Sequence, residues 1–301
     1  MAIDISDLFV DELVGAVVPT LKDAAIPFKA FSMDVSSQLK TKGETVKVPV
    51  IGVSTSAEYD ASSNNYEDAN TTDVPTTDVT LASHYKSTGS LTDIQSNKTV
   101  VDVWAPTLNE QIYANANKAL ADLMDVMTPT NFTHAAGYTG SYENFDSDSV
   151  VECKIACDVA KVPKPNRSMI LSSEYLGGLL KDGSLKDISQ SGSAEALRQG
   201  TITNTVANFR MFDTNIIPDN SVNLAGWCGH PSSIALATRV VMPQSGSEKV
   251  IQHRVITDPE TGFSMGVRIH YAAATGTVYM TAEMLWGKSF IRNAGILILS
   301  E

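Results

Sequence analysis

The first 166 residues of this chain contain no arginine, and lysine does not make up the deficit. Residues 1–160 carry 23 acidic residues against 9 lysines, a balance of −14. Residues 161–301 carry 11 acidic residues against 13 basic ones, a balance of +2. Proteins that read a nucleic-acid sequence usually present a basic patch that neutralises phosphates. No such patch is visible in the sequence, which argues against a sequence-specific nucleic-acid reader.

Cysteine is scarce, and long apolar runs are missing. The three cysteines, Cys153, Cys157 and Cys228, are sparse and odd in number, which fits a reducing compartment. The strongest apolar run, at 294–299, has the length of a strand and cannot span a membrane. Acidic residues occupy the N-terminus, where a signal peptide needs a basic region. We therefore expect a protein that is made in the cytosol and has no membrane partner.

Patterns typical of catalysis fail on context. Residues 262–266 (GFSMG) match a nucleophile elbow around Ser264, but a turn precedes them and a strand pattern follows, where the elbow needs a strand and then a helix. Residues 287–289 (GKS) lack the upstream glycine of a phosphate-binding loop. Cys153 and Cys157 lack the further ligands of a metal site, and we interpret them as small buried thiols. We expect no catalytic residue, cofactor or metal.

The most distinctive segment is a polar tract. Residues 54–85 contain neither lysine nor arginine and are rich in Ser, Thr, Asn, Asp and Glu. Strand-like runs at 45–50 (TVKVPV) and 79–82 (VTLA) bracket the tract, which predicts an extended hairpin projecting from the body of the fold. A loop of this length is normally either functional or disordered. A helix is expected to begin after it.

Two longer helices are predicted in the first half. The first begins near Ser6, a good N-cap, and ends at Pro19. The second begins at Pro106, follows a shorter segment at 94–104, and has apolar residues every three or four positions up to Met127. Its far side carries polar residues and is expected to lie away from the core; these are Gln111, Asn115, Lys118 and Asp122.

The second half alternates between strands and helices before it becomes rich in strands. The patterns predict strands at 168–171, 209–212 and 226–230, helices at 174–181 and 232–240, and a flexible connection at 183–200. Further strands are predicted at 267–273, 278–282, 288–292 and 295–299, with a turn at 275–276.

The order of these parts resembles the tailed-phage major capsid proteins of the Hong Kong 97 type. Five strings carry the resemblance: KGETVKVP at 42–49, RSMILSSEY at 167–175 with LLKD at 179–182, FRMF at 209–212 with NIIP at 215–218, GWCGH at 226–230 with IALA at 234–237, and EMLWGKSFIR at 283–292. Asn208 stands where glycine is commoner in the family. The resemblance spans nearly the whole chain, and its weight lies in the order and spacing of the strings.

The resemblance implies an α+β fold with an N-terminal arm, an extended β-hairpin loop, a long spine helix, a peripheral domain and an axial domain. On this sequence we expect the arm at 1–44, the extended loop at 45–93, the peripheral domain with the spine helix at 94–165 and 245–301, and the axial domain at 166–244.

By the same resemblance, we expect the repeating subunit of an icosahedral shell around double-stranded DNA, located in the virion and assembled in the host cytoplasm. The expected partners are further copies in hexamers and pentamers, a scaffolding protein, a portal protein, a decoration protein, and packaged DNA bound without sequence specificity. The first helix begins within six residues of Met1, which leaves no room for a cleaved scaffolding segment and favours a separate scaffolding protein.

The uneven charge predicts where neighbouring subunits meet. We expect the acidic loop of one subunit to contact basic residues from the second half of the next. The candidates are Glu58, Tyr59, Tyr66, Glu67 and Asp68 on the loop, and Arg167, Arg198, Arg254 and Arg268 on the neighbour. Three alternatives stay open: an encapsulin-type nanocompartment shell protein with the same fold, a phage tail or decoration protein, and a hydrolase using Ser264.

Overall fold

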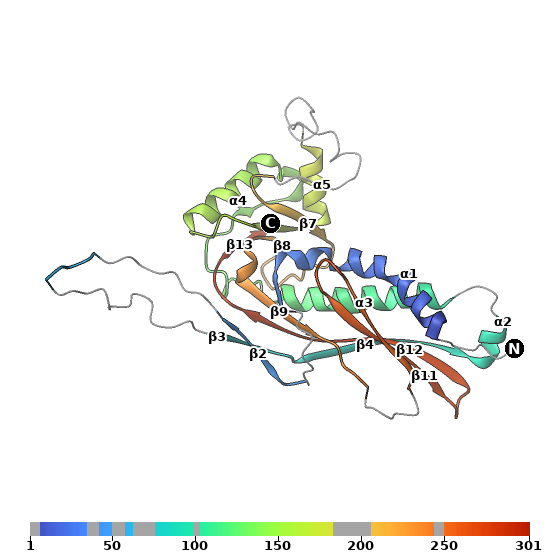
Figure 1. Cartoon of the computed structure of the whole chain (residues 1–301). Helices are drawn as coiled ribbons and strands as arrows, with labels where there is room; N and C mark the ends of the chain where they lie inside the picture. Colours follow the sequence, from blue (N-terminus) through green and yellow to red (C-terminus); the bar gives the residue numbers. More distant parts are fainter. Residues whose placement is uncertain are drawn as a thin grey trace.

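Two sheets organise the part of the chain that the structure describes (Figure 1). The structure is a computed structural model that describes residues 7–34, 42–49, 58–62, 76–98, 103–182, 206–243 and 250–301. The large sheet has the order β1-β9-β12-β11-β10, with β4 on the other side of β12. Its strands are β1 (Ser32–Asp34), β4 (Ser83–Thr92), β9 (Ile234–Arg239), β10 (Val250–Thr257), β11 (Ser264–Ala272) and β12 (Thr277–Phe290).

The small sheet has the order β5-β13-β8-β6-β7. Its strands are β5 (Tyr138–Thr139), β6 (Ser168–Ser172), β7 (Arg210–Thr214), β8 (Leu224–Gly229) and β13 (Gly295–Leu299). The helices are α1 (Asp7–Ala25), α2 (Asp93–Lys98), α3 (Trp104–Met124), α4 (Ser147–Val159) and α5 (Ser173–Lys181), with 3-10 turns η1 (Ile26–Ala30), η3 (Tyr142–Asn144) and η4 (Pro231–Ser233). The α+β class is therefore confirmed. No helix in the described ranges is long and apolar enough to cross a membrane.

Helix α3, predicted at 106–127, lies between α1 and the large sheet (Figure 1). Its apolar residues are buried as predicted, but most of the polar side is buried as well. Gln111 and Asn115 are each 4% exposed and donate hydrogen bonds to the carbonyls of Met280 (3.3 Å) and Ala282 (2.9 Å) in β12. The expectation that this side lies away from the core is wrong for Gln111, Asn115 and Asp122, and the two amides satisfy strand carbonyls that the helix covers. It is right for Lys118, which is exposed.

Helix α1 covers the opposite side of α3. Thr20 donates a hydrogen bond to Asn109 (2.9 Å), and Tyr113 donates one to Asp23 (2.6 Å), which raises the pKa of Tyr113 to about 12. Pro19 lies inside α1 rather than at its end, so the predicted end of this helix is wrong. Val17 and Leu21 are fully buried on either side of Pro19, and this burial offsets the backbone hydrogen bond that proline removes.

Two segments predicted as helix are strands. After residue 82 the chain forms β4, which pairs with β12 from Ser83↔Trp286 to Thr92↔Thr277. Its Ser- and Thr-rich sequence has only a weak apolar alternation, because none of its residues is fully buried. Residues 234–239, predicted within a helix, form β9, in which every residue is buried. A strand covered on both faces has no alternation to distinguish it from a short buried helix.

The strand pairing crosses the expected domain boundaries. Strand β9, from the segment expected to be axial, pairs with β12 in the large sheet. Strand β13, from the segment expected to be peripheral, pairs with β8 in the small sheet. Helix α4, also expected to be peripheral, shares a core with the small sheet. The division into domains stays a prediction. Each of the two sheets joins segments expected to be peripheral with segments expected to be axial.

Candidate functional site

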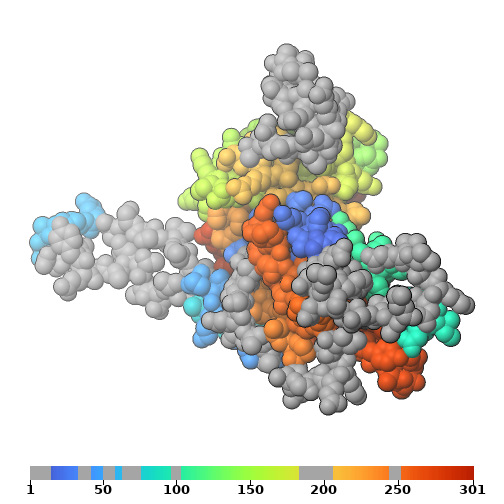
Figure 2. All heavy atoms as spheres, turned by 45° about the vertical axis from the view of Figure 1, so that its right-hand side comes forward, coloured from blue at the N-terminus to red at the C-terminus, as the bar shows by residue number. Residues whose placement is uncertain are grey.

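A hairpin leaves the body beside the large sheet. Strands β2 (Thr45–Pro49) and β3 (Thr76–Thr80) pair antiparallel from Thr45↔Thr80 to Pro49↔Thr76, close to where the sequence predicts them. Residues 58–62 lie far beyond these strands, away from both sheets (Figure 1). Figure 2 shows the same segment, in light blue, apart from the other described residues. The hairpin therefore places residues 58–62 where they contact neither sheet.

The base of the hairpin is fixed by a small apolar cluster. Val79 and Leu81 are fully buried against Ala235, Ala237 and Leu285 of the large sheet. Val46 and Val48 of β2 pack against the same cluster. Beside it, the backbone N–H of Gly43 donates to the carbonyl of Leu81, and the N–H of Leu81 donates to that of Glu44, both at 2.9 Å. The direction of the hairpin is thus set by packing at its base.

One glycine permits this contact. Gly287 lies in β12 directly beneath the end of β3, where a Cβ would overlap the carbonyl oxygen of Thr80 and lie 2.7 Å from its carbonyl carbon. These are backbone atoms, which cannot rotate away. This role was not predicted from the sequence, where GKS at 287–289 resembles the end of a phosphate-binding loop. In the structure these three residues lie within β12. Lack of a side chain at 287 lets the hairpin base cross the long strand closely.

The outer segment presents acidic and aromatic side chains. Glu58, Tyr59 and Asp60 are exposed, Tyr59 to 47%. Asp60 accepts hydrogen bonds from the N–H (2.8 Å) and the hydroxyl (2.7 Å) of Ser62, which form a local turn. The other three loop candidates, Tyr66, Glu67 and Asp68, lie outside the described residues.

The four candidate arginines differ in their surroundings. Arg167 is 1% exposed: it pairs with Asp158 (2.8 Å) and donates to the carbonyls of Val162 (2.6 Å) and Pro163 (3.0 Å). Its guanidinium is used within its own subunit, and we withdraw it as an intersubunit contact. Burial was not foreseeable from the sequence, because nothing local marks Asp158 as the partner.

The other three arginines remain candidates. Arg268 lies 2.5 Å from Glu283, whose second oxygen lies 3.4 Å from His84, and it keeps 26% of its side chain exposed. Arg254 is half-buried on β10. Arg198 lies outside the described residues. The structure therefore places Arg254 and Arg268 on neighbouring strands of the large sheet, on the same body as the hairpin base.

An apolar stripe on α4 was missed by the sequence analysis. Val151, Ile155 and Val159 are 45%, 57% and 78% exposed, one above the other at spacings of four. We name these three residues the α4 stripe. The opposite side of the helix is buried, with Val150, Cys153 and Cys157 at 0% exposure. The signal was present as apolar residues on two sides of the helix, where a helix that is covered on one side only needs a single apolar side.

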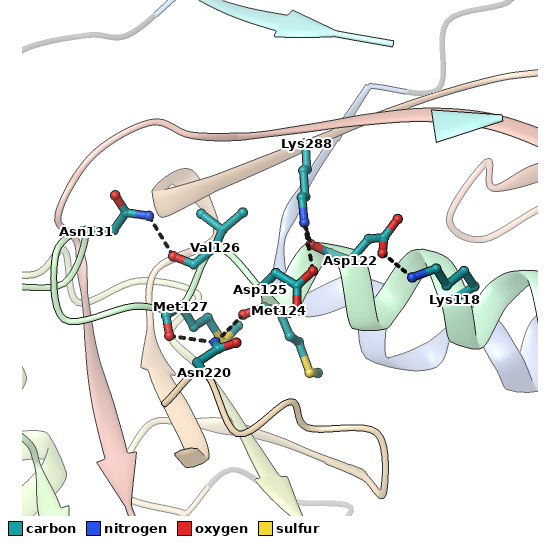
Figure 3. A network of polar contacts seen from close by, with 9 residues as sticks. All are labelled: Lys118, Asp122, Met124, Asp125, Val126, Met127, Asn131, Asn220 and Lys288. Atoms are coloured by element: carbon teal, nitrogen blue, oxygen red, sulfur yellow. Dashed lines mark hydrogen bonds and ion pairs between the residues drawn. The ribbon is translucent and has the colours of Figure 1, made fainter. Parts of the chain in front are cut away.

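The C-terminal end of α3 is held by side chains from both sheets (Figure 3). Lys288 of β12 donates to the carbonyl of Asp122 and lies 3.2 Å from the carboxylate of Asp125. Asp122 also pairs with Lys118 one turn earlier (2.8 Å), and this hydrogen bond raises the pKa of Lys118. A cation is favourable here, because the last carbonyls of a helix have no partner within it.

Two amides complete this helix end. Asn220, in the loop from β7 to β8, donates to the carbonyls of Met124 (3.0 Å) and Met127 (2.8 Å). Asn131 donates to the carbonyl of Val126 (2.7 Å) (Figure 3). We name Lys288, Asn220 and Asn131 the α3 clamp. Since Lys288 comes from the large sheet and Asn220 from a small-sheet loop, the clamp joins the two sheets through one helix end.

Polar residues that could suggest a catalytic or metal site have other structural roles. Ser264 begins β11 and is followed by strand, and its hydroxyl lies 3.0 Å from the hydroxyl of Thr257. Asp146 caps the N-terminus of α4 by accepting from the N–H of Ser149 (2.9 Å). Within the described ranges, no group of three or more His, Cys, Asp or Glu side chains could hold a metal ion.

Comparisons with known proteins find a similar fold but no similar sequence family. No family model and no curated protein matches the sequence. Among solved structures, the capsid of the cyanophage P-SCSP1u has a TM-score of 0.57 and 12% identity, covering 90% of this chain and 86% of that chain. The capsid of Ralstonia phage GP4 gives 0.56 and 11%, with 90% and 89% covered. The capsid of a native GTA particle gives 0.54 and 16%, with 92% and 91% covered. This chain has the Hong Kong 97-like fold of these capsid structures.

Proposed function

We propose that this chain is the major capsid protein of a tailed phage, which assembles into the icosahedral shell enclosing a double-stranded DNA genome. The observation that carries the proposal is the match of the fold to phage capsids over about nine-tenths of both chains. The hairpin supports it, because a projection that contacts little of its own body gains its stabilisation from other subunits. A nanocompartment shell or a tail protein is not favoured by these structural neighbours.

The hairpin is proposed as one of two contacts between subunits. Residues 54–85 carry acidic residues and no lysine or arginine, and Glu58 and Tyr59 lie at the far end of the described hairpin. We assign the neighbour's contribution to Arg254 and Arg268, with Tyr66, Glu67, Asp68 and Arg198 as further candidates. Because opposite charges exposed to solvent are screened by salt, assembly should weaken as ionic strength rises. Assembly that is equally efficient at low and high salt would contradict this contact.

The α4 stripe is proposed as a second contact between subunits. Burying a valine or isoleucine fully is worth about 1.5–3 kcal/mol. Three such side chains exposed in a row on one helix are unfavourable in a subunit that works alone. Contact through this stripe needs no charge, so it should persist at salt concentrations that weaken the hairpin contact.

The remaining assignments follow from the shell and are proposals with it. The subunit would sit in the virion as hexamers and pentamers, assemble in the host cytoplasm with a scaffolding and a portal protein, and could carry a decoration protein. Packaged DNA would touch the shell without sequence-specific contacts. The arm at 1–44, the extended loop at 45–93, the peripheral parts and the axial part at 166–244 are proposed to take the roles that the family resemblance gives them.

Negative-stain electron microscopy of the recombinant protein tests the proposal. The protein should be imaged alone and with a candidate scaffolding protein from the same gene cluster. Closed shells or rings of capsomer size are the expected result. Monomers that persist in both samples at high concentration would contradict the proposal. The variant Ile155→Lys, which alters only the α4 stripe, separates a failure of that contact from a failure of the function.

A further inference from the structure

Three thiols meet beneath the small sheet. Cys153 and Cys157 lie one turn apart on the buried side of α4. Cys228 lies in β8, between Met169 of β6 and Ile296 of β13. All three side chains are 0% exposed and carry free thiols. The Sγ atoms of Cys157 and Cys228 are 3.8 Å apart.

This separation is close to that of a disulfide. An S–S bond measures about 2.0 Å, so the two sulfurs must approach by about 1.8 Å. Both residues lie on regular elements that pack directly on each other, and side-chain torsions can supply a shift of that size without a change of fold. The two thiols need no large chain motion to react, because they already contact each other.

We propose that Cys157 and Cys228 form a latent intrachain disulfide, which a peroxide closes and which then joins α4 covalently to β8. This inference goes beyond the proposed function and does not depend on it. For the shell subunit alone, and resting on that proposal, the pair would be reduced in the cytosol and oxidised once the particle leaves the cell.

The two thiols differ in pKa, and the reaction requires one thiolate and one thiol. A hydrogen bond from Cys228, together with the nearby Arg167 guanidinium, lowers the pKa of Cys157 despite its burial. Hydrogen bonds with Cys153 and Cys157, together with burial, raise the pKa of Cys228. Cys157 is therefore the better thiolate, and Cys228 stays a thiol that can resolve an oxidised neighbour.

The reaction balances with hydrogen peroxide as the only added reactant. The Cys157 thiolate attacks one peroxide oxygen; an S–O bond forms, the O–O bond breaks, and hydroxide leaves and becomes water with the thiol proton. The sulfur of Cys228 then attacks the sulfenic sulfur of Cys157, forming the S–S bond and releasing the second water. Two thiols lose two electrons and two protons, and one peroxide becomes two waters. Because all three thiols are buried, the reaction requires a local opening of α4 that admits peroxide.

The test uses the purified, unassembled full chain, so its outcome does not depend on shell formation. The protein is incubated with millimolar hydrogen peroxide, quenched, and mapped by mass spectrometry without reduction. The expected result is an intact mass lower by about 2 Da, a Cys157–Cys228 linked peptide, and a Tm higher by roughly 5 °C that a reductant reverses. Cys157→Ser and Cys228→Ser should lose both the link and the shift in Tm.

Cys153→Ser is the matched control, since it removes the third thiol of the same cluster and should keep the link. A Cys153–Cys228 link, sulfinic or sulfonic products without a link, or three thiols that stay reduced would each overturn the proposal. The map of the unmodified chain decides the matter even where a serine variant fails to fold.

Discussion

Helices α3 and α4 are completed to very different degrees by their own chain. Helix α3 is covered by α1 on one side and the large sheet on the other, so even Gln111 and Asn115 are buried. Helix α4 is covered on one side only and leaves Ile155 57% exposed. A helix that its own chain already surrounds gains little from a partner, whereas the α4 stripe gains apolar burial from one. The surroundings of α3 therefore stabilise the subunit, whereas the open side of α4 is the one we propose for assembly.

The same substitution in the two helices tests this comparison most strongly. Ile112→Ala removes a fully buried side chain from α3 and should lower the free energy of unfolding by about 2–5 kcal/mol. Ile155→Ala in α4 should change it by less than about 0.5 kcal/mol. Urea denaturation of both variants provides the measurement. Equal losses would show that α4 is as fully enclosed as α3.

Gly287→Ala tests whether the hairpin base is locked to the large sheet. The new Cβ meets the backbone of Thr80, and overpacking of this kind should cost about 1–3 kcal/mol. Gly177→Ala in α5 is the control, because its Cβ would enter open space and alanine favours a helix by about 0.5–1 kcal/mol. Thermal denaturation should move the two variants in opposite directions. A stable Gly287→Ala protein would mean that the hairpin base is free to shift.

The α3 clamp can be dissected at Asn220. Asn220→Ala removes the amide that serves Met124 and Met127, and also disfavours the positive φ of 51° at this residue. Asn220→Gly removes the amide but permits that φ. We expect a loss of about 1–2 kcal/mol for Asn220→Gly and a larger loss for Asn220→Ala, measured by urea denaturation. If glycine restored full stability, the hydrogen bonds would contribute nothing.

The buried Arg167 makes stability depend on pH. Its hydrogen bond and positive charge lower the pKa of Asp158 below the ordinary value of 3.8. A lowered carboxyl pKa stabilises the folded chain above that ordinary value, and the stabilisation is lost as pH falls through the lower, folded-state pKa. Tm measured from pH 6 down to pH 2 should therefore fall more steeply below pH 4 for the unmodified chain than for Asp158→Asn. Parallel curves would show that the Arg167–Asp158 pair does not contribute to the pH dependence of stability.

The smallest effect on the isolated subunit is expected at the α4 stripe. Ile155→Lys replaces one exposed side chain by another and should leave Tm within about 2 °C. Particle formation, followed by light scattering and electron microscopy, should be lost, because a lysine cannot be buried in an apolar contact. Glu152→Lys, on the same helix beside the stripe, is the control and should still assemble. Shells formed by Ile155→Lys would exclude the stripe as a contact.

The sequence predicted those elements whose pattern is carried by one strongly amphipathic or turn-bounded segment. The helix around Ile112, the strands predicted at 45–50 and 168–171, and the hairpin followed from periodicity and flanking residues. It failed at β9 because both faces are buried, and at β4 because a polar edge strand has little apolar signal. Both depend on neighbours distant in sequence, which a local pattern does not contain.

The candidate site was predicted less fully than the fold. The acidic loop was visible from composition, but the burial of Arg167 depends on Asp158, and the role of Gly287 depends on Thr80. Such pairs become neighbours only in the folded chain. The α4 stripe was visible as apolar residues, yet the sequence does not say which side of an apolar helix the protein leaves open.

The pairing of strand β1 makes completion of the large sheet depend on residues that are synthesised much later. Ser32 pairs with Ala235 of β9, so an edge of the large sheet is made of residues roughly two hundred positions apart. At about 5–20 residues per second, the ribosome needs roughly 10–40 s to supply the second strand after the first. Chains cut short before β9 lack this partner. The large sheet can therefore be completed only after residues 234–239 have been synthesised, and a polypeptide that ends before them cannot form it.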